Sequence, residues 1–234
     1  MRPVDKGQCP YTSIGNYREA RPYLIERLGE LCSYCEMHLD FGLAVEHVQP
    51  KSRQPKKECE WDNLLLACGN CNPTKGDTDI NDANIHDYLW PDMDNTFVAL
   101  KYSEGGIVSV NEALPEEIKE KTWKLIQLVG LDKTPDVSQD CSDRRWQNRC
   151  DAWNKAKRAK ARLAKVEEKF NDDHNLREEI VDLVEGYFSI WMTVFADDAD
   201  MKRRFIDKFV GTAKDCFDEQ GNPVPKGQVH FSES

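Results

Sequence analysis

Two Cys-x-x-Cys pairs constrain this chain more than any other feature of its sequence. The pairs are Cys32/Cys35 and Cys68/Cys71, and 32 residues separate them. Two residues between thiols let a tight turn present both sulfurs to one ion, and two such turns complete a tetrahedral tetrathiolate zinc site. Because the interval is longer than in a simple zinc ribbon, we expect a folded insert between two zinc knuckles. Four thiolates leave no position for water, which predicts a structural zinc and not a catalytic one.

The other five of the nine cysteines do not pair in the sequence. An odd number of cysteines does not suit a disulfide framework, and the charged first thirty residues contain no apolar stretch typical of a secretory signal. The longest nearly uncharged apolar stretch, residues 186–196, is shorter than the roughly 20 residues that a membrane-spanning helix needs. We therefore expect a globular, cytoplasmic protein without a membrane span.

The charge balance excludes a protein that coats nucleic acid or membrane by bulk electrostatics. The chain has 32 Lys and Arg against 42 Asp and Glu, a net charge of −10. Two segments are nevertheless basic. Lys51, Arg53, Lys56 and Lys57 form a loop that is either solvated or suited to hold a substrate strand through its phosphates. Residues 144–169 combine ten positive charges with an apolar stripe at helical spacing, which leaves three interpretations: a solvated face, a nucleic-acid track or a dock for an acidic partner.

The insert between the cysteine pairs has the pattern of a small α+β unit. Residues 45–48 and 64–67 are apolar and short, as in strands, and a polar, proline-containing loop separates them. After Cys71, Pro73 suits the first turn of a short helix and Gly76 suits its end. The sequence therefore predicts the order strand, loop, strand, short helix.

This unit resembles the zinc-bearing branch of the HNH nucleases, whose site is a ββα-metal fold. The resemblance covers roughly residues 32–78, about a fifth of the chain, and includes both cysteine pairs. The other landmarks follow in the family's order: Glu46, His47, Pro50, Asn63, Leu64, Asn72, Lys75 and Gly76.

The resemblance implies a metal-dependent endonuclease that hydrolyses phosphodiester bonds. It implies that His47 is the general base, a role suited to a side chain whose pKa is ordinarily about 6.5. It also implies that Glu46 and Asn72 hold a divalent Mg²⁺ or Mn²⁺, which prefers such oxygen ligands, and that Asn63 braces the loop that orients His47. The family more often has Asp at position 46. Lys75 is expected to reach a substrate phosphate from the helix, together with the basic loop.

A closer similarity is to the PtuB family, the HNH effector subunits of Septu and of some retron anti-phage systems. It implies an ABC-type ATPase of the PtuA kind as partner, and in retrons a reverse transcriptase with its RNA-linked DNA. The substrate is then DNA or RNA, including tRNA. A non-catalytic zinc-knuckle module that binds nucleic acid, or an adaptor subunit, is the alternative. The segments that carry this similarity are residues 1–7, 32–36, 46–52 and 61–68.

The remaining sequence predicts an α+β fold in which a mostly helical C-terminal region follows the nuclease module. We expect a nuclease domain at 1–112, a helical domain at 113–218 and a flexible tail at 219–234. A Gly-Gly turn predicts a hairpin near the end of the first domain. The expected hairpin strands are 96–102 and 107–110, and the expected helices are 18–30, 115–129, 144–169, 175–195 and 199–217.

Overall fold

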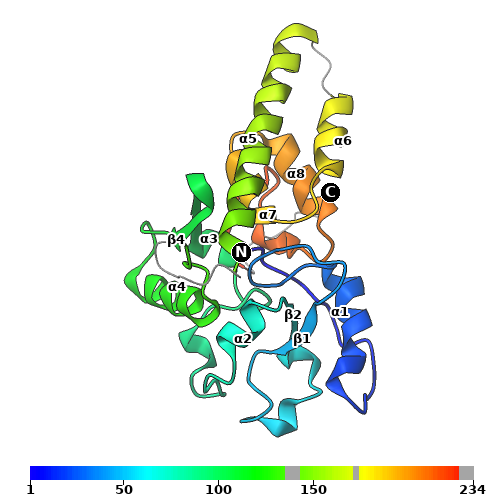
Figure 1. Cartoon of the computed structure of the whole chain (residues 1–234), viewed down its shortest axis with the longest axis vertical. Coiled ribbons are helices and arrows are strands. Elements are labelled where there is room, and N and C mark those ends of the chain that lie inside the picture. The colour runs from blue at the N-terminus through cyan, green and yellow to red at the C-terminus, as the bar shows by residue number, and fades with distance from the viewer. Residues whose placement is uncertain (135–142, 171–173, 227–234) are drawn as a thin grey trace.

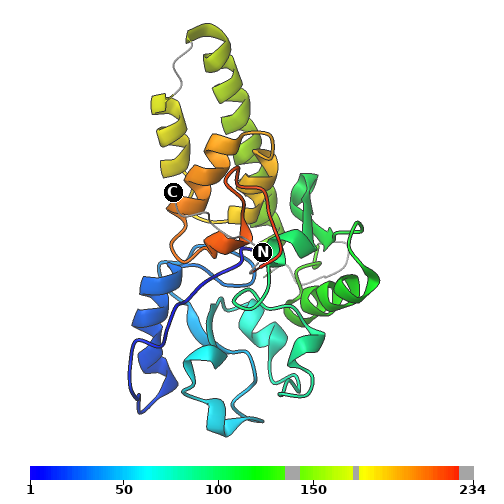
Figure 2. The same ribbon diagram turned by 180° about the vertical axis from the view of Figure 1, so that it is seen from behind.

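The computed structural model describes residues 1–134, 143–170 and 174–226. The molecule is elongated, with the strands β1 and β2 toward one end and the long helix α5 beside α6 at the other (Figure 1). Seen from behind, the C-terminal helices again lie above the strand pair (Figure 2). The elements are α1 (Arg21–Leu28), β1 (Ala44–His47), β2 (Leu64–Ala67), α2 (Cys71–Lys75), α3 (Thr96–Ala99), β3 (Leu100–Ser103), β4 (Ile107–Val110), α4 (Glu116–Val129), α5 (Arg145–Phe170), α6 (His174–Asp182), α7 (Phe188–Val194) and α8 (Ala199–Lys208).

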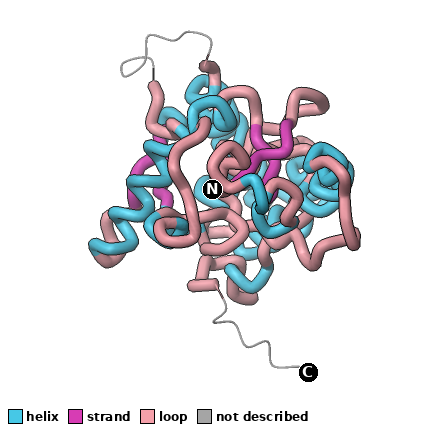
Figure 3. The backbone as a smooth tube through the Cα atoms, turned by 90° about the horizontal axis from the view of Figure 1, so that it is seen from below, coloured by secondary structure: helices cyan, strands magenta, loops and turns pink. Residues whose placement is uncertain are grey.

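Two separate antiparallel strand pairs supply the β structure (Figure 3). In the first pair Ala44 lies opposite Ala67 and His47 lies opposite Leu64, so β1 ends and β2 begins at the long loop between them. The second pair is the hairpin of β3 and β4. The expected α+β class is confirmed, as are the two strands between the cysteine pairs and the short helix that ends at Gly76.

Two hydrophobic clusters form the core of the described residues. The first surrounds β1, β2, α1 and α4, and Tyr34 and Trp90 are among its largest fully buried side chains. The second lies among α5, α7 and α8, where aromatic rings such as Phe195 and Phe205 meet edge to face at 5.4 Å. In the described part of the chain, no helix is both long enough and apolar enough to cross a bilayer.

Glu36 joins the two halves of the molecule. It follows Cys35 directly, and its carboxylate accepts hydrogen bonds from the backbone N of Ser189 at 2.9 Å and from the Ser189 hydroxyl at 2.5 Å, at the start of α7. Its backbone carbonyl accepts a third bond, from the N of Tyr187 at 2.9 Å. The first turn of α7 is therefore fixed to the segment that carries the first cysteine pair.

The helix expected at 175–195 is instead two helices, α6 and α7, with an irregular segment between them. Glu36 explains the break. A Cβ at Gly186 would lie 2.8 Å from the Glu36 carbonyl oxygen, and Tyr187 adopts a left-handed φ of 59°. A left-handed residue does not fit within a continuous α-helix, and the close approach at Gly186 leaves no room for a side chain, so a tertiary contact overrides the local helical pattern.

Two other expected boundaries are also wrong. The helix expected at 199–217 ends at Lys208, because the chain turns at Gly211, where a Cβ would lie 2.0 Å from the Arg27 carbonyl oxygen. The first hairpin strand begins at Leu100 and not at residue 96. Residues 96–99 form a helical turn because the Asn95 side chain caps the backbone N–H groups of the following residues. Residues 135–142 and 171–173 of the expected helical domain and residues 227–234 of the expected tail lie outside the described residues.

Candidate metal centre and active site

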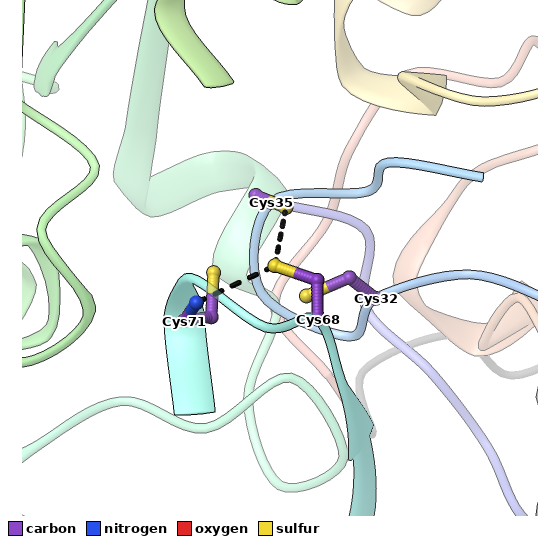
Figure 4. Close-up of side chains that lie close together, drawn as sticks. All are labelled: Cys32, Cys35, Cys68 and Cys71. Atoms are coloured by element: carbon purple, nitrogen blue, oxygen red, sulfur yellow. Dashed lines mark hydrogen bonds between the residues drawn. The ribbon is translucent and has the colours of Figure 1, made fainter. Parts of the chain in front are cut away.

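The sulfur atoms of the four predicted zinc ligands all lie within 4.8 Å of one another (Figure 4). Cys32 and Cys35 come from the segment after α1, Cys68 directly follows β2, and Cys71 begins α2. All four side chains are buried, and the sulfurs of Cys35 and Cys68 are 3.7 Å apart. Sulfurs at the corners of a tetrahedral zinc site are about 3.8 Å apart for Zn–S bonds of about 2.3 Å. The cluster therefore has the donor set and the approximate spacing of a tetrathiolate zinc site.

Arg145, on the first turn of α5, lies directly against this cluster. Its Nη1 donates to the Cys71 sulfur at 3.0 Å and to the carbonyl of Val129 at 2.6 Å, and its Nη2 donates to Asp143 at 2.7 Å. A buried guanidinium offsets part of the negative charge that four thiolates leave on a bound zinc. The sequence did not identify this residue, which was counted only as one charge of the basic helix.

His47 is the last residue of β1, and its ring is held from two sides. The Nε2 atom lies 2.9 Å from the backbone carbonyl of Glu58, and the ring of Tyr17 meets the imidazole edge to face with centroids 4.7 Å apart. A carbonyl can only accept a hydrogen bond, so Nε2 carries the proton and Nδ1 keeps its lone pair. Burial lowers the pKa of His47, and the bond to Glu58 only partly opposes this shift.

Asn63 crosslinks the loop that holds Glu58 against His47. Its Oδ1 accepts from the N of Gln49 at 2.7 Å, and its Nδ2 donates to the carbonyls of Gln49 and Lys57, both at 3.0 Å. The side chain is buried, and these three bonds use both ends of its amide. The Asn63 side chain thus fixes the loop at both ends, at Gln49 and at Lys57.

Glu46 and Lys75 form a buried ion pair beside His47. The Lys75 ammonium lies 2.8 Å from a carboxylate oxygen of Glu46 and donates to the His47 carbonyl at 2.6 Å. Burial raises the pKa of Glu46, and the Lys75 charge opposes this shift. The Lys75 side chain is 0% exposed. The lysine therefore points inward to Glu46, and the expectation that it reaches a substrate phosphate stays a prediction that requires Lys75 to leave this pair.

Asn72 lies on α2, three residues before Lys75 and thus on the same helix face. Its backbone N donates to the Cys68 carbonyl at 3.1 Å, so the cysteine cluster fixes the start of the helix that carries it. A carboxylate and an amide oxygen are suitable ligands for a hard divalent cation. Glu46 and Asn72 both carry such oxygens, and Lys75, on the same face of α2 as Asn72, contacts Glu46.

The predicted basic loop keeps part of its charge at the surface. Lys51 lies 4.1 Å above the ring of Tyr17 and 3.5 Å from Glu58, so it is beside His47. Arg53 donates to the carbonyl of Asp77 at 2.7 Å, and Lys57 pairs with Asp82, while Lys56 is exposed. Among these four cations, Lys51 contacts Tyr17 and Glu58, the same two residues that hold the His47 ring.

The basic helix α5 uses much of its charge within the fold. Arg149 is buried and donates to the carbonyls of Gly106 at 2.9 Å and Leu131 at 2.8 Å. Lys157 pairs with Glu104 at 2.7 Å, and Lys160 pairs with Asp197. Together with Arg145, these contacts favour a structural role for the helix over a continuous nucleic-acid track.

Comparison with known proteins identifies the unit that this geometry describes. Residues 32–78 match the sequence profile of the HNH endonuclease family. We call this matched segment the HNH domain. The domain contains the cysteine cluster, the strands β1 and β2 and the helix α2. The family resemblance expected from the sequence is therefore confirmed for this segment.

A curated relative extends the comparison beyond the HNH domain. The chain is 39% identical over 72 residues to the Septu protein PtuB of Bacillus thuringiensis. The alignment covers 28% of this chain and 28% of the length of the relative. The expected similarity to PtuB is thus confirmed for this part of the chain.

Proposed function

We propose that the HNH domain hydrolyses phosphodiester bonds of DNA or RNA, including tRNA, with Mg²⁺ or Mn²⁺, and that the chain is the nuclease effector of an anti-phage complex. The observation that carries this proposal is the contact between His47 Nε2 and the Glu58 carbonyl, within a domain of the HNH endonuclease family. This contact leaves Nδ1 as a proton acceptor, which a hydrolytic site needs.

His47 acts as the general base in this proposal. Its lowered pKa keeps the imidazole neutral at pH 7, so Nδ1 can take a proton from water as the water oxygen forms its bond to phosphorus. The bond from phosphorus to the leaving oxygen then breaks, and that oxygen departs with the electron pair. The Glu58 carbonyl stabilises the imidazolium that forms, because it accepts a hydrogen bond from Nε2–H throughout.

Glu46 and Asn72 would hold the divalent cation, which neutralises charge on the phosphate and on the leaving oxygen when bound. Lys75 already places a positive charge 2.8 Å from Glu46. Lys75 favours the ionised form of this carboxylate against the effect of burial, and a metal ion at Glu46 would compete with Lys75 for it. Asn63 supports the site by fixing the loop that carries Glu58, and Lys51, Arg53, Lys56 and Lys57 surround it with positive charge.

The partner is proposed from the similarity to a Septu protein PtuB. A PtuA-like ABC-type ATPase would control the nuclease, and a retron version of the system would add a reverse transcriptase with its RNA-linked DNA. The net charge of −10 supports control by a partner, because an acidic chain binds nucleic acid weakly by itself.

The test compares cleavage by the zinc-loaded wild type, His47→Ala and the matched control His38→Ala. Each is incubated with phage DNA and with total cellular RNA, with and without Mg²⁺ or Mn²⁺ and with and without the co-expressed ATPase. We expect His47→Ala to lose about 10²–10⁴-fold in rate while it keeps its zinc and its fold. Unchanged cleavage by His47→Ala contradicts the mechanism. Nucleic-acid binding without cleavage in every sample favours the zinc-knuckle binding module instead.

A further inference from the structure

A cavity of about 510 Å³ lies behind the loop that follows His47. Its walls come from four segments, residues 5–7, 48–49, 57–63 and 82–93. This volume is in the range of small-molecule sites. Gln49 and Asn63 are part of the wall, so the cavity shares with the candidate active site the residues that fix the loop.

The two lysines of the cavity already have acceptors. The Lys6 ammonium donates to the carbonyls of Asp62 and Leu64, each at 3.0 Å, and to Asp92 Oδ2 at 2.7 Å, which uses all three of its protons. Lys57 pairs with Asp82. Both lysines are therefore paired with carboxylates, so the cavity does not favour an anionic ligand.

Two buried oxygens of the same walls have no hydrogen-bond donor among the described residues. They are Gln49 Oε1 and Asp92 Oδ1. Gln49 is only 3% exposed, and the side chain of Asp92 is 7% exposed. A buried acceptor without a donor is unfavourable, because the group has lost its water without gaining a partner. Both atoms therefore call for a ligand that donates hydrogen bonds.

Acidic side chains add negative charge around these two oxygens. Five carboxylates line the cavity against two lysines, and the carboxylates of Asp5, Glu60 and Asp62 belong to exposed residues. The cavity therefore attracts a positively charged ligand.

A bare metal ion does not fit this arrangement. Within the described residues, the carboxylates of this cavity do not belong to any group of three or more ligand atoms within 4.8 Å. The walls also contain Val48, Ile85 and Met93, which offer apolar surface between the acceptors. We propose that the cavity binds an organic cation, an aliphatic chain that ends in an ammonium or guanidinium group.

Occupation of the cavity would act on the loop of the candidate active site. Gln49 lies two residues after His47 and provides one of the two unpartnered oxygens. Its backbone is held by the Asn63 side chain. A cation bound to Gln49 stabilises that end of the loop. The ligand source is either a free polyamine or a lysine or arginine side chain of another protein.

The test is titration calorimetry of the full, zinc-loaded chain at 150 mM NaCl, without nucleic acid. One arm uses spermidine, a second uses a short peptide with adjacent lysine and arginine, and a third uses MgCl₂. We expect one equivalent of spermidine or of peptide to bind, and the arm that binds identifies the source. Gln49→Leu and the rim double variant Glu60→Gln/Asp62→Asn should each weaken binding about tenfold, the equivalent of losing one charge-assisted hydrogen bond.

The double variant Glu120→Gln/Glu219→Gln is the matched control, because it removes two exposed carboxylates outside the cavity. It should bind as the wild type does. The proposal is overturned if neither organic cation binds, if Mg²⁺ displaces them at equal charge, or if the control loses as much affinity as the rim variant. The rim variant keeps the test valid if Gln49→Leu does not fold. Since no substrate is present, the result is independent of whether the chain is a nuclease.

Discussion

The HNH domain and the helical C-terminal half are stabilised by different means. The HNH domain has two strands of four residues each and a helix of five. Polar contacts of Asn63 and Lys75, together with the cysteine cluster, link these short elements and the loop between the strands. The helical half has a cluster of aromatic rings among α5, α7 and α8. These short elements bury their apolar side chains in the first hydrophobic cluster, and we expect the HNH domain to depend in addition on zinc at the cysteine cluster and on its polar contacts.

Zinc removal is the largest perturbation of this difference. Structural zinc provides on the order of 10 kcal/mol of folding free energy in small domains, so chelation or Cys68→Ser should unfold the HNH domain. We expect hydrogen exchange to accelerate in residues 32–78, while the segments 145–168 and 188–208 lose less protection. Cys9→Ser, which replaces an exposed thiol outside the cluster, is the control. Uniform loss of protection along the chain would show that the two halves unfold as one unit.

Loss of aromatic packing should destabilise the helical half and leave the cysteine cluster of the HNH domain intact. Phe205 is 0% exposed and contacts the rings of Trp191 and Phe195. Phe205→Ala should reduce the free energy of unfolding by about 3–5 kcal/mol, measured by urea denaturation, with zinc content unchanged. Phe41→Ala is the matched control, because Phe41 is 82% exposed and its loss should cost less than about 0.5 kcal/mol. Zinc release by Phe205→Ala would contradict the separation between the halves.

Arg145 tests the point where α5 touches the cysteine cluster. Arg145→Met keeps an unbranched side chain but removes the donor to Cys71 and the charge beside the cluster. Loss of a group that hydrogen-bonds a metal ligand typically lowers metal affinity by about 10–100-fold, so zinc transfer to a chelator should proceed at lower chelator concentration. Arg158→Met, at an exposed position of the same helix, should leave zinc affinity unchanged. Equal affinity in both variants would show that the contact is not energetically important.

The pH dependence of His47 is the smallest effect. Its pKa in the folded protein is below 6.5, so its neutral form is favoured by the fold. The stability that this shift contributes is complete above pH 6.5 and is lost as the pH falls through the folded pKa. Cleavage should follow the same direction, with its acidic limb below pH 6.5. The measurement is a pH–rate profile at saturating Mg²⁺, and an acidic limb above pH 6.5 would oppose a buried imidazole as the base.

Local spacing in the sequence was sufficient to predict the centre of the HNH domain. Two Cys-x-x-Cys pairs, two apolar runs and Pro73 with Gly76 define the cluster, β1, β2 and α2 through contacts between near neighbours. The division at residue 112 and the catalytic roles of the site residues stay predictions.

Features that depend on distant contacts were not predictable. Arg145 is 74 residues from Cys71, and the break before α7 exists because Tyr187 and Gly186 meet Glu36. The inward direction of Lys75 follows from the position of Glu46 on another element, which its place on α2 does not reveal. Charge counts on a helix likewise do not separate buried guanidinium groups from solvated ones.

The three hydrogen bonds of Asn63 also determine where this protein can change. They fix the loop at Gln49 and at Lys57, and Glu58 contacts His47 just beyond the second point. Residues 50–56 form the part of the loop between these two fixed points, and most of them are exposed. Since the entropy cost of a longer loop grows only slowly with its length, this segment can acquire insertions or new side chains while the imidazole keeps its place. This segment can therefore vary in sequence and length without moving the His47 ring.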